Sequence, residues 1–110
     1  MKIAVFGDKS EITYNEFDLL VKEKITSGDE VICGSPSHIN KLSELWAERN
    51  RIKREILNID FKKCGRNASY YNKRKIISEC DVCYIVGSDN NNYAKFCEEF
   101  NKKVEFLEFS

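Results

Sequence analysis

Three glycines, each ending a short apolar segment and preceding polar residues, are the positions of this chain best placed to hold a ligand. They are Gly7, Gly34 and Gly87. A glycine lets the backbone approach a ligand closely, and the free N–H groups at the start of a following helix bind anions. The side chains expected to contact a ligand in these loops are Asp8, Lys9, Ser35, Ser37, His38 and Ser88. The spacing predicts a site for a ligand that carries phosphate groups.

Three of these side chains also have a structural interpretation. His38, the only histidine, has an ordinary pKa of about 6.5, which suits a general acid or a phosphate contact. It is also an ordinary polar residue near a helix start. Ser35 and Ser37 would donate hydrogen bonds to phosphate oxygens or cap the helix, and the two roles are compatible.

Charge is balanced over the whole chain but not along it. Lysine plus arginine and aspartate plus glutamate each number 18, so net charge gives no indication of a nucleic acid polymer as partner. The counter-charges expected for an anionic ligand are Lys9, Lys73 and Arg74. Charged runs usually form a solvated face, to which we assign Lys62, Lys63 and Lys75.

The sequence contains no arrangement typical of a catalytic centre. There is no Gly-x-Ser-x-Gly motif, no phosphate-binding Walker loop and no paired carboxylate motif. We therefore expect no catalytic residue and favour binding without turnover. A hydrolase of nucleotides or N-glycosides is one alternative, and it would need Glu44 or Asp89 turned into the crevice. A protein-interaction module built on a decayed pocket is another.

Cysteine content and hydropathy predict the compartment. The five cysteines include the Cys80–Cys83 pair with CxxC spacing, but no second Cys or His pair completes a zinc site. We expect reduced thiols, no metal and no cofactor. No apolar run approaches the roughly 20 residues of a membrane span, and no signal peptide begins the chain, so we predict a cytoplasmic protein without a membrane partner.

Strands and helices are expected to alternate along the chain. Thr13-x-x-Glu16 has the spacing of a capping box, and Phe17 to Ile25 continues with helical periodicity. Further helices are predicted over Lys41 to Asn50, with Ile39 also on its apolar face, and over Tyr70 to Glu79 and Asn90 to Asn101. The predicted strands cover Lys2 to Phe6, Glu30 to Cys33, Lys53 to Ile59, Asp81 to Val86 and Val104 to Phe109.

This alternation predicts a single doubly wound, Rossmann-like α/β domain over residues 1–110. We expect a mostly parallel five-stranded sheet in the order 3-2-1-4-5, with the first and fourth strands inside it because they are the most continuously apolar. Right-handed crossovers then bring Gly7, Gly34 and Gly87 to the same, carboxyl edge. A crevice opens there, where the strand order reverses.

Nearly the whole chain resembles the YspA-like branch of the SLOG superfamily, small Rossmann-like proteins related to the Lonely Guy phosphoribohydrolases. The resembling segments are Met1 to Gly7, Gly28 to Gly34, Leu42 to Glu48, Asp60-Phe61, Gly65 to Ala68, Asp81 to Val86 and the last helix and strand. The ligand loops differ. Where that family has Gly-x-Arg, Gly-Gly-Ala-x-Gly-Ala-Asp and Asp-Gly-x-Ser-x-Gly-Thr, this chain has Gly7 to Lys9, Gly34 to Asn40 and Gly87 to Asn92.

The resemblance implies a nucleotide or nucleotide-derived small molecule, such as an ADP-ribose derivative, bound at the carboxyl edge. The family's Arg-Asn pair falls on Asn72-Lys73, which adds Asn72 to the expected ligand contacts. Related small proteins often dimerise through helices, so a homodimer is expected as well. The apolar side chains expected to supply its surface are Leu42, Leu45, Trp46 and Tyr93.

Overall fold

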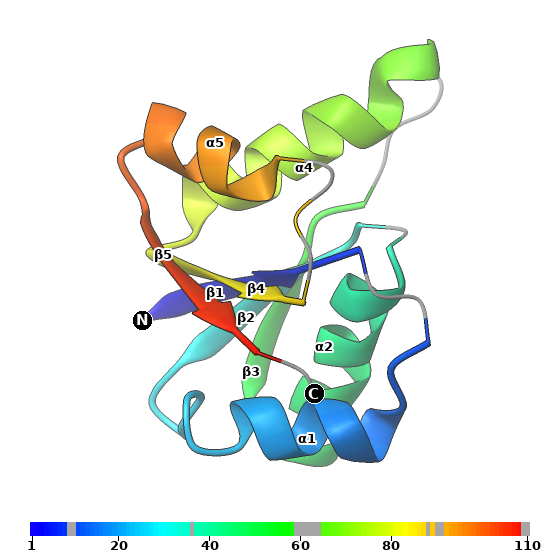
Figure 1. The fold of residues 1–110 in the computed structure, drawn as a ribbon, viewed down its shortest axis with the longest axis vertical. Coiled ribbons are helices and arrows are strands. Elements are labelled where there is room, and N and C mark those ends of the chain that lie inside the picture. Colours follow the sequence, from blue (N-terminus) through cyan, green and yellow to red (C-terminus); the bar gives the residue numbers. More distant parts are fainter. Residues whose placement is uncertain (9–10, 36, 59–64, 88, 90–91, 109–110) are drawn as a thin grey trace.

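A computed structural model shows a five-stranded sheet between two layers of helices (Figure 1). It describes residues 1–8, 11–35, 37–58, 65–87, 89 and 92–108, with Arg66 and Ser69 described by their backbone only. The strands are β1 (Lys2–Phe6), β2 (Glu30–Cys33), β3 (Lys53–Ile56), β4 (Val82–Val86) and β5 (Lys103–Leu107). The helices are α1 (Tyr14–Val21), α2 (His38–Arg49), the 3-10 turn η1 (Gly65–Asn67), α4 (Ala68–Glu79) and α5 (Tyr93–Glu99).

All neighbouring strands are parallel, in the order β3-β2-β1-β4-β5. The predicted fold class and strand order are therefore confirmed. β1 is central and pairs Ile3 with Val31 on one side and with Val82 on the other. Every residue of β4 is buried, as expected for a strand covered on both faces.

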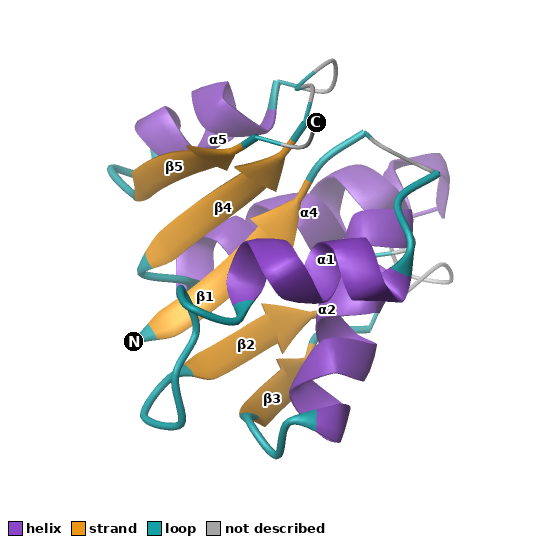
Figure 2. Cartoon of the chain, turned by 60° about the horizontal axis from the view of Figure 1, so that its bottom comes forward, coloured by secondary structure: helices purple, strands orange, loops and turns teal. Residues whose placement is uncertain are grey.

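Alternation along β1 divides the interior into two cores. Ile3 and Val5 belong to the core beneath α1 and α2, whereas Ala4 and Phe6 belong to the core beneath α4 and α5. Figure 2 shows α1 and α2 on one face of the sheet and α4 and α5 on the other. Successive strand residues point to opposite faces, so β1, β2 and β4 each contribute to both cores.

The residues proposed for a dimer surface belong mainly to these cores. Leu42 and Trp46 pack beneath α1 and α2, and Tyr93 packs beneath α5. Their exposed fractions are 9%, 3% and 6% respectively, and Leu45 is half-buried. This set therefore does not supply the surface expected of it, because these side chains pack between the helices and the sheet.

Helix starts follow their caps. The capping box of α1 is confirmed: Thr13 Oγ1 accepts from the Glu16 N–H at 3.2 Å, and Glu16 Oε1 accepts from the Thr13 N–H at 3.0 Å. Ser37 caps α2, so this helix begins three residues before Lys41, where the sequence suggested. The first helix ends at Val21 rather than near Ile25, although Ile25 stays buried.

Other element ends also differ from expectation. α4 begins at Ala68, two residues before its expected start, and α5 covers only Tyr93–Glu99 of the range Asn90 to Asn101. Asn92 at its start and Asn101 beyond its end have φ near +56°, which stops the helix at both ends. β3 ends at Ile56, while Ile59 and Phe109, the expected last residues of β3 and β5, lie outside the described residues. No described helix has the length and apolar character needed to cross a membrane.

Candidate functional site

Gly7, Gly34 and Gly87 directly follow β1, β2 and β4. These strands are parallel, and their arrows point to the same edge of the sheet (Figure 2), so the three glycines that follow them lie at that carboxyl edge. The order of strands reverses between β1 and β4, which is where ligands bind in open α/β sheets. The structure therefore brings the three predicted loops to one edge.

At two of these positions, a neighbouring backbone segment lies so close that only glycine fits. A Cβ atom on Gly34 would lie 2.2 Å from the Leu57 carbonyl oxygen, and one on Gly7 would lie 2.3 Å from that of Val86. Gly34 also has φ of +128°, which L-residues rarely adopt. From the sequence we expected a ligand to lie close to these glycines. In the structure, the backbone at the end of the adjacent strand lies there instead.

The buried amide of Asn40 fills the corner between β2 and α2. Asn40 Oδ1 accepts hydrogen bonds from the N–H groups of Gly34 at 2.9 Å and Ser35 at 3.0 Å. Its Nδ2 donates to the carbonyl oxygen of Val5 at 3.1 Å, and the residue has no exposed surface. These two backbone donors of the second glycine loop are therefore not free to bind a phosphate. Sequence reasoning did not identify this residue, although an asparagine on the apolar side of a predicted helix is a signal.

The other polar residues of this corner also bind within the chain. Ser37 Oγ accepts from the Asn40 N–H at 3.4 Å, and Ser35 Oγ accepts from the Ser37 N–H at 3.3 Å. His38 Nε2 lies 2.8 Å from the carbonyl oxygen of Ile12, so this nitrogen donates and ties the β1–α1 loop to α2. The structural interpretation of these three residues accounts for their contacts.

A carboxylate occupies the start of α5. Asp89 Oδ1 accepts from the Tyr93 N–H at 2.6 Å, and Asp89 Oδ2 accepts from the Ala94 N–H at 3.1 Å. This negative charge disfavours a phosphate at the same helix end. Both Asp89 oxygens therefore already accept hydrogen bonds from α5, whereas a hydrolase would need this carboxylate turned toward its substrate.

Lys73 lies at the predicted edge on the face of the sheet covered by α4 and α5. Its ammonium is 4.3 Å from the ring centre of Phe96 and 5.1 Å from that of Tyr93. Tyr93 stacks on Phe6, the last residue of β1, at 4.7 Å between ring centres. Burial lowers the pKa of Lys73, and the charges of Asp89 and Asp8 partly oppose this effect. A half-buried cation therefore stands near the loops that follow β1 and β4.

Asn72, beside Lys73, carries a polar atom with no assigned partner. Its Nδ2 donates to the Leu57 carbonyl oxygen at 2.5 Å, and the residue is 6% exposed. Its Oδ1 is buried and has no hydrogen-bond partner within the described part of the chain. Buried polar atoms nearly always have a partner, so this oxygen is suited to a donor from a ligand.

Arg74 belongs to a different surface. Its Nη1 donates to the Tyr70 hydroxyl at 2.9 Å, and its guanidinium lies over the rings of Tyr70 and Phe100. The structure therefore groups Arg74 with the outer side of α4 and α5, not with the glycine loops. Lys9 and Ser88, the remaining predicted contacts, lie outside the described residues.

The four described cysteines are buried, and Cys33 and Cys80 remain protonated thiols at neutral pH. Burial raises the pKa of Cys33 to about 12, with a smaller effect from the Glu44 carboxylate, and raises the pKa of Cys80 to about 11. Cys80 and Cys83 are both fully buried in the core beneath α4 and α5. No group of three His, Cys, Asp or Glu side chains among the described residues is arranged to hold a metal ion.

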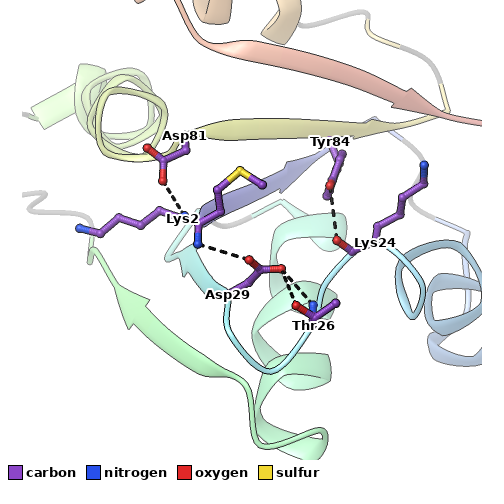
Figure 3. A network of polar contacts seen from close by, with 7 residues as sticks. Lys2, Lys24, Thr26, Asp29, Asp81 and Tyr84 are labelled. Carbon is purple, nitrogen blue, oxygen red and sulfur yellow. Dashed lines mark hydrogen bonds and ion pairs between the residues drawn. The ribbon is translucent and has the colours of Figure 1, made fainter.

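The opposite, amino edge of the sheet holds a polar network (Figure 3). The Lys2 N–H donates to Asp81 at 2.7 Å, and Asp29 accepts from the Thr26 N–H at 3.0 Å and pairs with the Met1 ammonium at 3.3 Å. These donors hold the pKa of Asp29 below its usual range, the Thr26 N–H contributing most. A shallow cavity of about 310 Å³ lies beside this network. Its polar groups are largely paired with one another, which indicates a structural role.

Comparisons of the chain with models of protein families, with curated proteins and with solved structures find no match.

Proposed function

We propose that this protein binds a nucleotide or nucleotide-derived small molecule without turning it over. The binding site is the carboxyl edge of the sheet between the loops that follow β1 and β4. The observation that carries this proposal is the half-buried cation of Lys73, whose charge interacts with those of Asp8 and Asp89 in these loops. Asn72, the preceding residue of α4, adds a buried amide oxygen on the side of Leu57 that has no hydrogen-bond partner among the described residues.

The two groups suit different parts of one ligand. An ammonium that has been partly desolvated forms a strong hydrogen bond with a phosphate oxygen. A buried amide oxygen accepts from a hydroxyl or amino group, and ribose and nucleobases carry such donors. The proposed relationship to the SLOG superfamily, which rests on the sequence segments given above, supports the same ligand class.

Binding without turnover is favoured by the contacts of two of the three candidate catalytic groups, Asp89 and His38; the third is Glu44. Both Asp89 oxygens accept hydrogen bonds from the start of α5, and His38 is bound to a backbone carbonyl. A general base must be able to reach the proton that it abstracts. Neither group is arranged for that role in this structure.

Isothermal titration calorimetry of the full chain tests the proposal with ADP-ribose, cyclic nucleotides and nucleoside monophosphates. Lys73→Met retains the aliphatic stem that packs on Phe96 but removes the charge, and should weaken binding roughly 10- to 150-fold. Lys95→Met, which removes an exposed charge from α5, is the matched control and should bind as the parent does. Absence of binding by every nucleotide, or equal affinities of both variants and the parent, would refute the proposal.

A protein-interaction module is the second candidate, and one observation favours it specifically. The helix starts at this edge are filled by side chains of the chain itself, Asn40 and Ser37 at α2 and Asp89 at α5. Backbone N–H groups at this edge that already bind these side chains are not available to an anion, so the edge has fewer free donors than we expected from the sequence. If no nucleotide binds in the titrations, this candidate replaces the first.

A further inference from the structure

β5 forms an open edge of the sheet. It is the last strand in the order β3-β2-β1-β4-β5 and pairs with β4 alone (Figure 2). An edge strand keeps one row of backbone N–H and C=O groups that no neighbouring strand uses, and such a row is a template for pairing with another chain. The hydrogen bonds between β4 and β5 show which residues carry this row.

The backbone of alternate β5 residues points away from β4. The Gly87 N–H donates to the carbonyl oxygen of Leu107 at 3.2 Å, so the backbone of Leu107 faces β4. The N–H and C=O of one strand residue point to the same side, and this side alternates along the strand. Glu105 therefore also faces β4, whereas Val104 and Phe106 direct their N–H and C=O groups outward. We call these outward groups the outer row of β5; among the described residues, no backbone group binds them from that side.

Both residues of the outer row are apolar. Val104 packs against the core beneath α4 and α5, and Phe106, two residues further along the strand, points to the same face. The Phe106 side chain is 54% exposed. β3, at the opposite edge, is charged at three of its four residues, which is a common protection of edge strands. β5 lacks this protection at the two positions from which a partner strand would be bound.

The charges around this edge are balanced. Glu105 is paired with Lys24 at 2.6 Å. The other charged side chains of residues 93–108, which comprise α5, β5 and the segment between them, are Lys95, Lys102, Lys103, Glu98, Glu99 and Glu108. Three cations thus face three carboxylates, and the surface selects neither a polyanion nor a polycation. An uncharged partner fits this edge best.

We propose that the outer row of β5 binds an uncharged, extended peptide segment of another protein, which adds to the sheet as a further strand. The unused N–H and C=O groups of Val104 and Phe106 alternate with the spacing of a β-ladder, so an extended backbone is the group that can satisfy both residues at once. A β-branched or aromatic side chain of the peptide would then pack against the exposed ring of Phe106. The proposal is independent of the nucleotide site, because it uses no residue of that site.

Amide hydrogen exchange of the full chain, measured by NMR, tests the outer row directly. In the free protein, the N–H groups of Glu105 and Leu107 should be protected by β4, whereas those of Val104 and Phe106 should exchange rapidly. The probe is the uncharged peptide acetyl-Ser-Val-Thr-Val-Thr-Val-Ser-amide. A short strand should bind with a dissociation constant on the order of 100 μM, so about 1 mM peptide should slow exchange at the outer row about tenfold.

Two proline variants separate loss of the outer row from loss of folding. Val104→Pro removes an N–H that faces outward, a position where edge strands tolerate proline, so the variant should fold as the parent does. Its affinity for the peptide should fall at least about fivefold, because one hydrogen bond is lost. Glu105→Pro is the matched control, because it removes an N–H that binds β4 and should lower the melting temperature strongly.

A second pair of variants tests the apolar side chain. Phe106→Lys places a charge at the exposed edge and should abolish the protection by the peptide without lowering the melting temperature. Leu19→Lys makes the same change at an exposed position of α1 and should bind as the parent does. The proposal would be overturned by an outer row that the peptide does not protect, or by equal protection in Phe106→Lys and the parent. Protection that rises with protein concentration in the absence of peptide would overturn it too, because a second copy of the chain would then occupy the edge.

Discussion

Replacement of Asn40 by alanine should destabilise the fold severely. The amide makes three hydrogen bonds, two from the N–H groups of Gly34 and Ser35 and one to the carbonyl oxygen of Val5. Each buried donor left without a partner costs about 1–3 kcal/mol, and the void left by the amide adds to this. Partial solvation of the loop reduces the sum, so we expect a loss of about 3–5 kcal/mol in the free energy of unfolding. For a chain of this size, that corresponds to a melting temperature lower by about 12–25 °C.

Urea unfolding followed by the fluorescence of buried Trp46 measures this loss. Asn50→Ala is the matched control, because Asn50 lies at the exposed end of the same helix and its Nδ2 donates to the carbonyl oxygen of Trp46 at 2.8 Å. That variant should lose no more than about 1 kcal/mol. The prediction is refuted if Asn40→Ala lowers the free energy of unfolding as little as the control does, with an unchanged dependence of that free energy on urea concentration. The Asn40 amide would then not stabilise the contact between the second glycine loop and β1.

The remaining predictions concern backbone approach, thiols and pH. Gly34→Ala should cost several kcal/mol in thermal unfolding experiments, because its Cβ would meet the Leu57 oxygen at 2.2 Å; a normal melting temperature would contradict this. In a Cys64→Ser variant, the native chain should not react with a thiol reagent at pH 8, whereas the denatured chain should react fully. The four cysteines left in this variant, all buried, are Cys33, Cys80, Cys83 and Cys97. Rapid labelling of the native chain would contradict the prediction, because it would show that one of them is accessible. Asp29→Asn should destabilise the chain at neutral pH by about 1 kcal/mol. Since the pKa of Asp29 is lowered in the folded state, its stabilisation is present above the ordinary carboxyl pKa and disappears as the pH falls through the folded-state value, so parent and variant should converge in acid.

The fold could be predicted because its signals are local and repeated. Continuous apolar segments such as Lys2–Phe6 and Val82–Val86 indicated buried parallel strands, and their glycine ends placed the loops on one edge. The Thr13–Glu16 capping box marked a helix start that the structure confirms. Helix ends were less certain because they depend on tertiary contacts and on residues with positive φ, such as Asn92.

The candidate site could be located from the sequence but not described in detail. The glycine pattern identified the correct edge, yet it could not show that neighbouring strand ends, rather than a ligand, approach Gly7 and Gly34. Nor could it show that Asn40 accepts the hydrogen bonds of the second loop, because those residues meet only after β1, β2 and α2 pack together. Arg74 was grouped with Lys73 by sequence proximity, although adjacent helix residues face different directions.

The most direct test of the account is a calorimetric titration of the parent chain and of Lys73→Met with ADP-ribose and nucleoside monophosphates. The account predicts that at least one nucleotide binds the parent and that the variant binds it roughly 10- to 150-fold more weakly, with its melting temperature unchanged. Equal binding by parent and variant would contradict the assignment of the site to Lys73. Absence of heat with all the nucleotides would contradict the proposed function itself.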